Sequence, residues 1–108
     1  MSYFAEILTR LQATIESRQG ADPASSYTAK LLAGGPALAG KKFGEEAVET
    51  VIAAMQADKD ALAAESADLI YHWLVLLAAS GVSLDEVAAK LEAREGTSGI
   101  VEKAGRAK

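Results

Sequence analysis

The stretch of sequence that decides the fold lies between Lys42 and Asp68. It begins with Lys42-Phe43-Gly44-Glu45-Glu46-Ala47-Val48-Glu49 and ends, after a turn, with Glu65-Ser66-Ala67-Asp68. Each end contains acidic residues spaced three apart, and residues with this spacing lie on the same face of an α-helix. If both ends are helical and antiparallel, four carboxylates converge on one small volume, those of Glu46, Glu49, Glu65 and Asp68.

Carboxylates that crowd together raise one another's pKa or push their helices apart unless a cation compensates them. The bland alternative is that these acids are solvated, because glutamate is common on exposed helix faces. Asp68, however, begins the most apolar run of the chain, where an unpartnered carboxylate is costly. Oxygen ligands in a chain without cysteine favour Mg²⁺ or Mn²⁺ over zinc. The sequence therefore predicts a metal site.

Length and composition predict one soluble all-α domain of four to five helices. The chain has 108 residues, is half apolar and contains two prolines and no cysteine. We expect a single domain over residues 1–108, with an ordered core over about 3–94 and a basic, glycine-containing tail over 95–108. The sequence shows neither a signal-peptide pattern nor an apolar run of the roughly 18–20 residues that span a bilayer. A cytoplasmic protein is the default expectation.

The net charge of −4 argues against a general nucleic-acid-binding protein, which would present a basic face. The charge is uneven, because residues 90–108 carry five basic and three acidic side chains. A small anionic substrate therefore remains compatible with the composition.

Hydrophobic periodicity and helix-stop residues place the helices. We expect an amphipathic helix over about 3–18 and one or two turns over 26–32. Two helices carry the acids, one over about 37–55 with Pro36 at its first turn, and one from the turn at 57–60 to about 79, with Gly81 as its stop. Ser83-Leu84-Asp85-Glu86 is a capping box that predicts the start of a last helix, which reaches about Arg94.

The apolar side chains of the helix over 37–55, among them Val48, Val51 and Met55, centre on one side. The helix that ends near 79 is apolar on every side beyond Asp68, and such a helix belongs in an interior. We therefore expect a second copy of the chain to cover much of it, in a homodimer. Tyr71 and Trp73 are expected in packing or in that interface.

The acidic pattern Glu-Glu-x-x-Glu, followed by Glu-x-x-Asp, resembles the signature of the all-α MazG-like nucleotide pyrophosphohydrolases. Its positions are Glu45, Glu46, Glu49, Glu65 and Asp68. Flanking segments, including 26–31 and the tail Ser98-Gly99-x-x-Glu102-Lys103-x-x-Arg106, are similar to the phosphoribosyl-ATP pyrophosphatase family of histidine biosynthesis. The resemblance covers about residues 4–106.

This resemblance implies the hydrolysis of 1-(5-phosphoribosyl)-ATP to the corresponding AMP derivative and pyrophosphate, with Mg²⁺ and with Mn²⁺ as a possible substitute. Glu46, Glu49, Glu65 and Asp68 would hold the ions, which would clamp the triphosphate and activate a water. The catalytic set is expected to be Glu45, Glu46 and Glu49. Glu45 lies at the edge of the acidic arc, so a base or a supporting role is expected for it rather than direct ligation.

Several other residues are expected to contact the substrate. Lys30 and Lys42 lie in the family-like segments and are assigned to phosphate contacts, although solubilising lysines are the alternative. Arg94, Lys103 and Arg106 lie among glycines whose N–H groups could join them in a second anion site. A frayed C-terminus is the alternative for that segment.

Two aromatic side chains near these positions have open assignments. Tyr27 is assigned either to stacking or to hydrogen bonding with the substrate. His72, one turn after Asp68, is either a satisfied core histidine or a partner that orients Asp68, and is not expected to be a metal ligand.

Two other functions fit the same residues less well. One is a pyrophosphohydrolase of other (d)NTPs that uses the same acids, and the other is a non-enzymatic helical dimer or scaffold. The cyclohydrolase that performs the next step uses Cys and His metal ligands, whereas this chain has no Cys and one His. We therefore expect that partner activity to reside on a separate chain.

Overall fold

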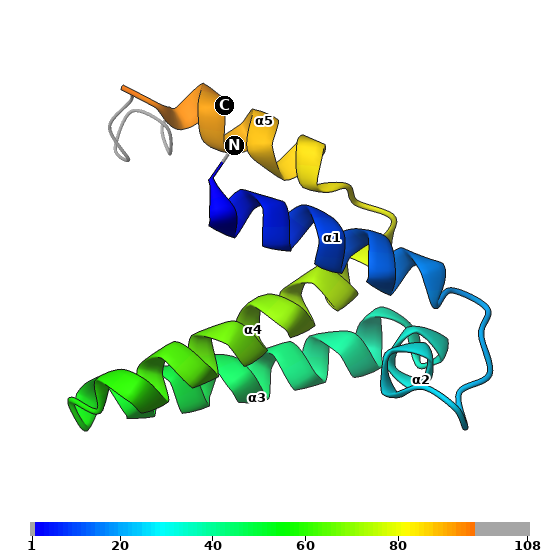
Figure 1. Cartoon of the computed structure of the whole chain (residues 1–108), viewed down its shortest axis with the longest axis horizontal. Helices are drawn as coiled ribbons and strands as arrows, with labels where there is room; N and C mark the ends of the chain where they lie inside the picture. The colour runs from blue at the N-terminus through cyan, green and yellow to red at the C-terminus, as the bar shows by residue number, and fades with distance from the viewer. Residues whose placement is uncertain (1, 97–108) are drawn as a thin grey trace, which may run out of the picture.

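The computed structural model describes residues 2–96, and over this range the chain forms five α-helices and no strand. Their bounds are α1 (Tyr3–Ser17), α2 (Tyr27–Ala33), α3 (Gly35–Met55), α4 (Lys59–Ser80) and α5 (Leu84–Arg94). Figure 1 shows α3 and α4 side by side as a long helical hairpin, with α2 at one end and α1 and α5 above α4. The all-α prediction is confirmed.

Polar caps define where four of these helices begin. The side chains of Ser2, Ser26 and Asp58 accept hydrogen bonds from the third residue beyond them and so start α1, α2 and α4. The predicted capping box of α5 is present, with Ser83 N–H donating to Glu86 Oε2 at 2.7 Å and Glu86 N–H donating to Ser83 Oγ at 3.1 Å.

Glycine and proline mark the other boundaries. α4 ends at Gly81, whose φ of 72° is the left-handed conformation that glycine adopts without strain. α3 begins at Gly35, about two residues before the predicted start, and Pro36 lies in its first turn, where the missing N–H removes no helical hydrogen bond.

The buried core is small and centres on the C-terminal half of α4. Its most buried side chains are Ile15 of α1, Leu31 of α2, Ala39 of α3, and Leu74 and Val75 of α4. Tyr71 and Trp73 pack against this cluster. α4 therefore contacts α1, α2 and α3, which explains why its apolar residues surround it on every side.

By length and composition alone, α4 could cross a membrane. The sequence has no uninterrupted apolar run of that length, but few charged residues interrupt α4 as a whole. α4 packs along α3, and its C-terminal half contributes Leu74 and Val75 to the buried core.

The apolar side of α3 faces outward. Val48, Val51, Ile52 and Met55 are 60%, 60%, 48% and 78% exposed, although they follow the i, i+3, i+4, i+7 spacing of a buried stripe. The residues of α3 that are buried are the small Ala39 and Ala53. α3 thus approaches its neighbours through small side chains, and its large apolar side chains remain uncovered within one chain.

Candidate functional site

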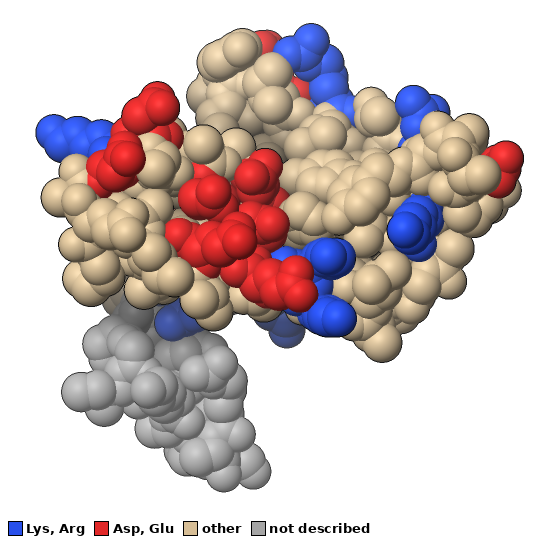
Figure 2. Space-filling view, turned by 90° about the horizontal axis from the view of Figure 1, so that it is seen from below, with Lys and Arg blue, Asp and Glu red and all other residues tan. Residues whose placement is uncertain are grey.

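The α3–α4 hairpin brings the acids of its two helices together. One carboxylate oxygen each of Glu46, Glu49 and Glu65 lies within 4.8 Å of the other two. Asp68 is outside this trio, and its side chain is exposed, yet its charge still acts on Glu46 and Glu65. Figure 2 shows a patch of acidic side chains at the centre of the face, with basic side chains beside it.

The crowding changes the protonation of two members of this carboxylate cluster. Burial raises the pKa of Glu46 from 4.5 to about 7, helped by hydrogen bonding to and repulsion from Glu49 and by the charge of Asp68. The pKa of Glu65 is also raised, first by burial and then by Glu49. Without a cation, Glu46 therefore retains its proton closer to neutral pH than an ordinary carboxyl group does, because its pKa is raised.

Two buried oxygen atoms of the cluster have no hydrogen-bond donor among the described residues, Glu46 Oε2 and Glu65 Oε2. Ionised carboxylates only accept hydrogen bonds, so neighbouring acids cannot satisfy one another unless one is protonated. A buried charge without a partner is costly, and a divalent cation would supply the missing partner to both oxygens. The donor set consists only of carboxylate oxygens, which suits a hard cation. The arrangement therefore fits a metal ion.

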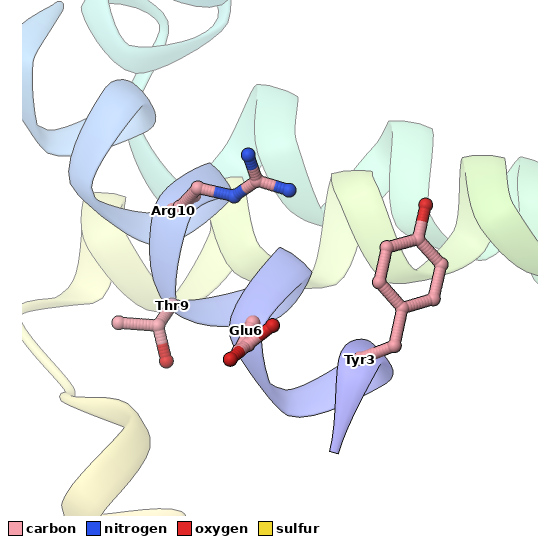
Figure 3. Close-up of a pocket in the computed structure, with 4 residues that line it drawn as sticks. All are labelled: Tyr3, Glu6, Thr9 and Arg10. Carbon is pink, nitrogen blue, oxygen red and sulfur yellow. The ribbon is translucent and has the colours of Figure 1, made fainter. Parts of the chain in front are cut away.

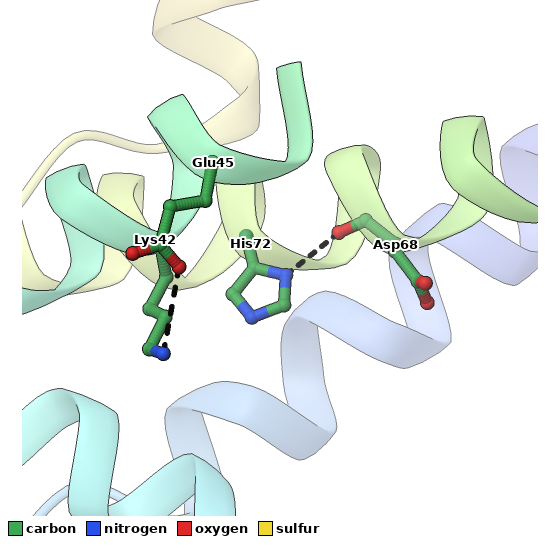
Figure 4. A network of polar contacts seen from close by, with 4 residues as sticks. All are labelled: Lys42, Glu45, Asp68 and His72. Carbon is green, nitrogen blue, oxygen red and sulfur yellow. Dashed lines mark hydrogen bonds and ion pairs between the residues drawn. The ribbon is translucent and has the colours of Figure 1, made fainter. Parts of the chain in front are cut away.

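Glu45 lies apart from this trio. Its Oε2 atom is 3.5 Å from Lys42 Nζ, one turn earlier on α3, and both side chains are partly exposed (Figure 4). The structure thus pairs the predicted phosphate-binding lysine with the predicted base rather than with the other acids.

His72 is 7% exposed, and its Nδ1 lies 2.8 Å from the main-chain carbonyl oxygen of Asp68. A carbonyl oxygen only accepts, so Nδ1 carries the proton. Figure 4 shows the Asp68 carboxylate pointing away from the imidazole ring. His72 is therefore a buried histidine satisfied by the main chain of Asp68, and it does not hold the carboxylate.

α2 carries the other predicted contacts. The Tyr27 ring is 53% exposed and meets His72 edge-on, with ring centroids 6.3 Å apart. A hydrogen bond of 2.5 Å between Thr28 Oγ1 and the Tyr71 hydroxyl joins α2 to α4. Lys30 is exposed on α2, and within the described range no ion pair or side-chain hydrogen bond links it to another residue.

The predicted second anion site is only partly described. Arg94 is exposed at the end of α5, which lies on the far side of α1 from the α3–α4 hairpin (Figure 1). Within one chain, this position separates Arg94 from the carboxylate cluster. Lys103 and Arg106 lie outside the described residues.

A hollow of about 290 Å³ adjoins the carboxylate cluster. Glu49 and Glu65 line it together with Ile52, Ala53, Gln56 and Ala61. Its walls combine two of the acids with apolar and amide groups.

A larger open hollow, of about 480 Å³, lies on α1 and contains none of the predicted residues. Tyr3, Glu6, Thr9 and Arg10 line it, and Figure 3 shows the Arg10 guanidinium and the Tyr3 ring extending from the same side of the helix. Arg10 gave no motif signal in the sequence. This hollow shares no lining residue with the one beside the carboxylate cluster.

Thr50 is the residue near the cluster that sequence reasoning missed. It lies one turn after Glu46 and contacts α4, but a single threonine in a helix carries no distinctive pattern. Only the register between α3 and α4 reveals its position.

Comparison with known proteins identifies the kind of enzyme to which this site is related. A family model described as phosphoribosyl-ATP pyrophosphohydrolase matches residues 8–95. A protein of Caulobacter vibrioides (strain NA1000 / CB15N) named phosphoribosyl-ATP pyrophosphatase is 74% identical over 102 residues, which cover 94% of each chain. Proteins of the same name from Caulobacter sp. (strain K31) and Cereibacter sphaeroides (strain KD131 / KCTC 12085) are 72% and 63% identical, over 98% and 93% of this chain and 98% and 97% of their own. The chain therefore belongs to the phosphoribosyl-ATP pyrophosphohydrolase family.

Proposed function

We propose that this protein hydrolyses 1-(5-phosphoribosyl)-ATP to 1-(5-phosphoribosyl)-AMP and pyrophosphate in L-histidine biosynthesis, with Mg²⁺ or Mn²⁺ as the cofactor. Family membership supports the substrate, since relatives that cover nearly the whole chain are named for it. The observation that carries the proposed chemistry is the carboxylate cluster with its two buried, unpartnered oxygens.

The residues of the carboxylate cluster are proposed to bind the cation, which in turn binds the phosphates. Glu46, Glu49 and Glu65 would hold the metal, and Asp68 would complete the set after a change of its exposed side-chain rotamer. A divalent cation in this position supplies positive charge against the triphosphate and makes water more acidic. Glu46 and Glu49, as ligands, orient the reacting phosphate relative to α3.

Glu45 and Lys42 form the polar edge of this site. Lys42 exchanges its ion pair with Glu45 for a substrate phosphate, which leaves Glu45 Oε2 free to accept a proton from the attacking water. Tyr27, beside His72 on the other rim, contacts the nucleoside, and Lys30 contacts a phosphate. Arg94, Lys103 and Arg106 stay proposed for the ribose 5-phosphate on the positive charge of their segment alone, since Arg94 lies apart from the carboxylate cluster within one chain and the other two lie outside the described residues.

A second copy of the chain covers the outer side of α3 in this proposal. Val48, Val51, Ile52 and Met55 form an exposed apolar stripe of the kind that marks a protein–protein interface. The stripe also reaches the catalytic hollow, since Ile52 lines both. A homodimer through α3 would therefore shield one wall of the active site from water.

The cellular setting follows from the proposed reaction. We place the enzyme in the cytoplasm as a single domain over residues 1–108. The cyclohydrolase that consumes its product is a separate chain.

The test is a pyrophosphate-release assay on the wild type and on Glu49→Gln, with and without Mg²⁺, using phosphoribosyl-ATP, ATP and dUTP. We expect Mg²⁺-dependent turnover of phosphoribosyl-ATP and near-complete loss in Glu49→Gln, because Glu49 belongs to the trio. Glu92→Gln, on exposed α5, is the matched control and should keep full activity. Preferred cleavage of ATP or dUTP would favour a general (d)NTP pyrophosphohydrolase, and no Mg²⁺-dependent release from any substrate would favour a scaffold.

A further inference from the structure

The Thr50 side chain occupies the contact between α3 and α4 at the level of the carboxylate cluster. Its Oγ1 donates to the main-chain carbonyl oxygen of Glu46 at 2.7 Å and also to that of Glu65, on α4, at 3.2 Å. The side chain is partly buried. Because a hydroxyl has one proton, the two acceptors share it in a three-centre hydrogen bond.

Two other threonines of the chain show what is special about this contact. Thr9 donates to the carbonyl oxygen of Ala5 at 2.9 Å, and Thr14 donates to that of Arg10 at 3.1 Å. A hydrogen bond to the residue four positions earlier is ordinary for threonine in a helix. Thr50 adds an acceptor on a second helix, and its two acceptors belong to the residues whose Oε2 atoms are buried without a donor.

This hydrogen bond counteracts the repulsion between carboxylates in the metal-free site. Ionised carboxylates on α3 and α4 repel one another and push the helices apart. The hydroxyl of Thr50 links the main chains of Glu46 and Glu65, so it holds together the points from which two of the repelling side chains extend. Holding ligands near their final geometry before the ion arrives strengthens binding, since less order must be created on binding.

We propose that Thr50 is a positioning residue of the metal site, whose hydroxyl fixes the spacing between Glu46 and Glu65 and so preorganises their carboxylates for a divalent cation. This inference rests on the proposed function only in requiring that the cluster bind such a cation. It assigns to Thr50 no contact with the substrate.

The experiment measures the binding of Mn²⁺ alone to the full chain, by the electron paramagnetic resonance signal of the free ion. Thr50→Val removes the donor and keeps the branched shape, whereas Thr50→Ser keeps the donor. Thr14→Val is the matched control, because it removes a hydroxyl with only an intrahelical acceptor. We expect Thr50→Val to weaken Mn²⁺ binding by about tenfold or more, as is typical for groups that orient metal ligands. Thr50→Ser and Thr14→Val should stay within about threefold of the wild type on the same scale.

Kinetics provide a second measurement on the same variants. Thr50→Val should raise the Mg²⁺ concentration required for half-maximal activity, with a much smaller change in kcat at saturating Mg²⁺. Thr50→Ala also lacks the donor but is smaller than valine. If it reproduces the loss of affinity, the loss comes from the missing hydroxyl and not from a disturbance of helix packing by valine. Circular dichroism on each variant confirms that the helices are retained.

Four outcomes would contradict the inference. Wild-type Mn²⁺ affinity in both Thr50→Val and Thr50→Ala would overturn it, as would an equal loss in Thr14→Val. Failure of serine to restore binding would show that the hydroxyl is not what matters. If the wild type itself bound no Mn²⁺, the proposed metal site would fail and the inference with it, and that result is distinguishable because it does not depend on the variants.

Discussion

Replacing Glu46 by glutamine should stabilise the metal-free protein at neutral pH while it destroys the proposed metal site. Glutamine has nearly the same shape as glutamate and carries no charge, so it removes the repulsion with Glu49 and Asp68. Its amide also offers a donor to neighbouring oxygens that ionised carboxylates cannot provide. We therefore expect Glu46, which is proposed to be essential for activity, to lower the stability of the metal-free protein.

The magnitude follows from the pKa of Glu46, which rises from 4.5 to about 7 on folding. At about 1.4 kcal/mol for each pKa unit, the full shift corresponds to about 3.4 kcal/mol. Glu46 is only partly buried and the cluster opens to solvent, so screening reduces the expected contribution to about 1–2 kcal/mol. Because the folded-state pKa is raised, this contribution to stability is complete below the unfolded value of 4.5 and is lost as the pH rises through about 7.

The assay is urea unfolding in the presence of a chelator at about pH 5 and about pH 8, the two sides of the expected transition. Protein concentration is held constant, since association would alter apparent stability. Between these conditions the wild type should lose about 1–2 kcal/mol relative to Glu46→Gln, and Glu92→Gln should behave as the wild type. Added Mg²⁺ should restore the wild type at the higher pH and should have little effect on Glu46→Gln. Equal pH dependence in the wild type and Glu46→Gln would refute the electrostatic reasoning.

Three further changes probe other parts of the structure. Tyr71→Phe removes the hydrogen bond to Thr28 that joins α2 to α4, so we expect the free energy of unfolding in urea to fall by about 1 kcal/mol. In steady-state kinetics the KM for the substrate should rise with little change in kcat, and an unchanged KM would show that α2 does not contribute to substrate binding. Ser83→Ala breaks the capping box of α5 and should cost about 1 kcal/mol of unfolding free energy; turnover by the pyrophosphate assay should be unaffected, and lost turnover would show that α5 contributes to the site. Val51→Asp places a charge in the exposed stripe of α3 and should shift the protein toward monomers in sedimentation velocity, whereas an unchanged sedimentation coefficient would exclude α3 as the interface.

The helices could be predicted from the sequence because their ends carry local signals. The Ser83–Glu86 capping box and Gly81 act within a few residues, and both occur where the sequence indicated. The start of α3 was displaced, because Pro36 is compatible with any position in the first turn and does not define which one.

Only those features of the candidate site that depend on a single helix could be predicted from the sequence. The spacing of Glu46 and Glu49 places them on one face of α3, and the spacing of Glu65 and Asp68 does the same on α4. The register between the helices decides which side chains meet, and it leaves Asp68 outside the trio and brings Thr50 to the main chain of Glu65. It also decides that the apolar stripe around Val51 faces away from α4, which periodicity alone does not reveal.

The short turn between α3 and α4 has a consequence for how the protein acquires its chemistry. All the carboxylates of the cluster belong to a single hairpin, closed by the few residues between Met55 and Lys59. Closing a short loop costs little chain entropy, and contacts local in sequence form early during folding. We therefore expect the ligands to assemble before α1 and α5 dock. A nascent chain could then bind the cation of the proposed site as soon as this hairpin has emerged, before the remaining helices dock.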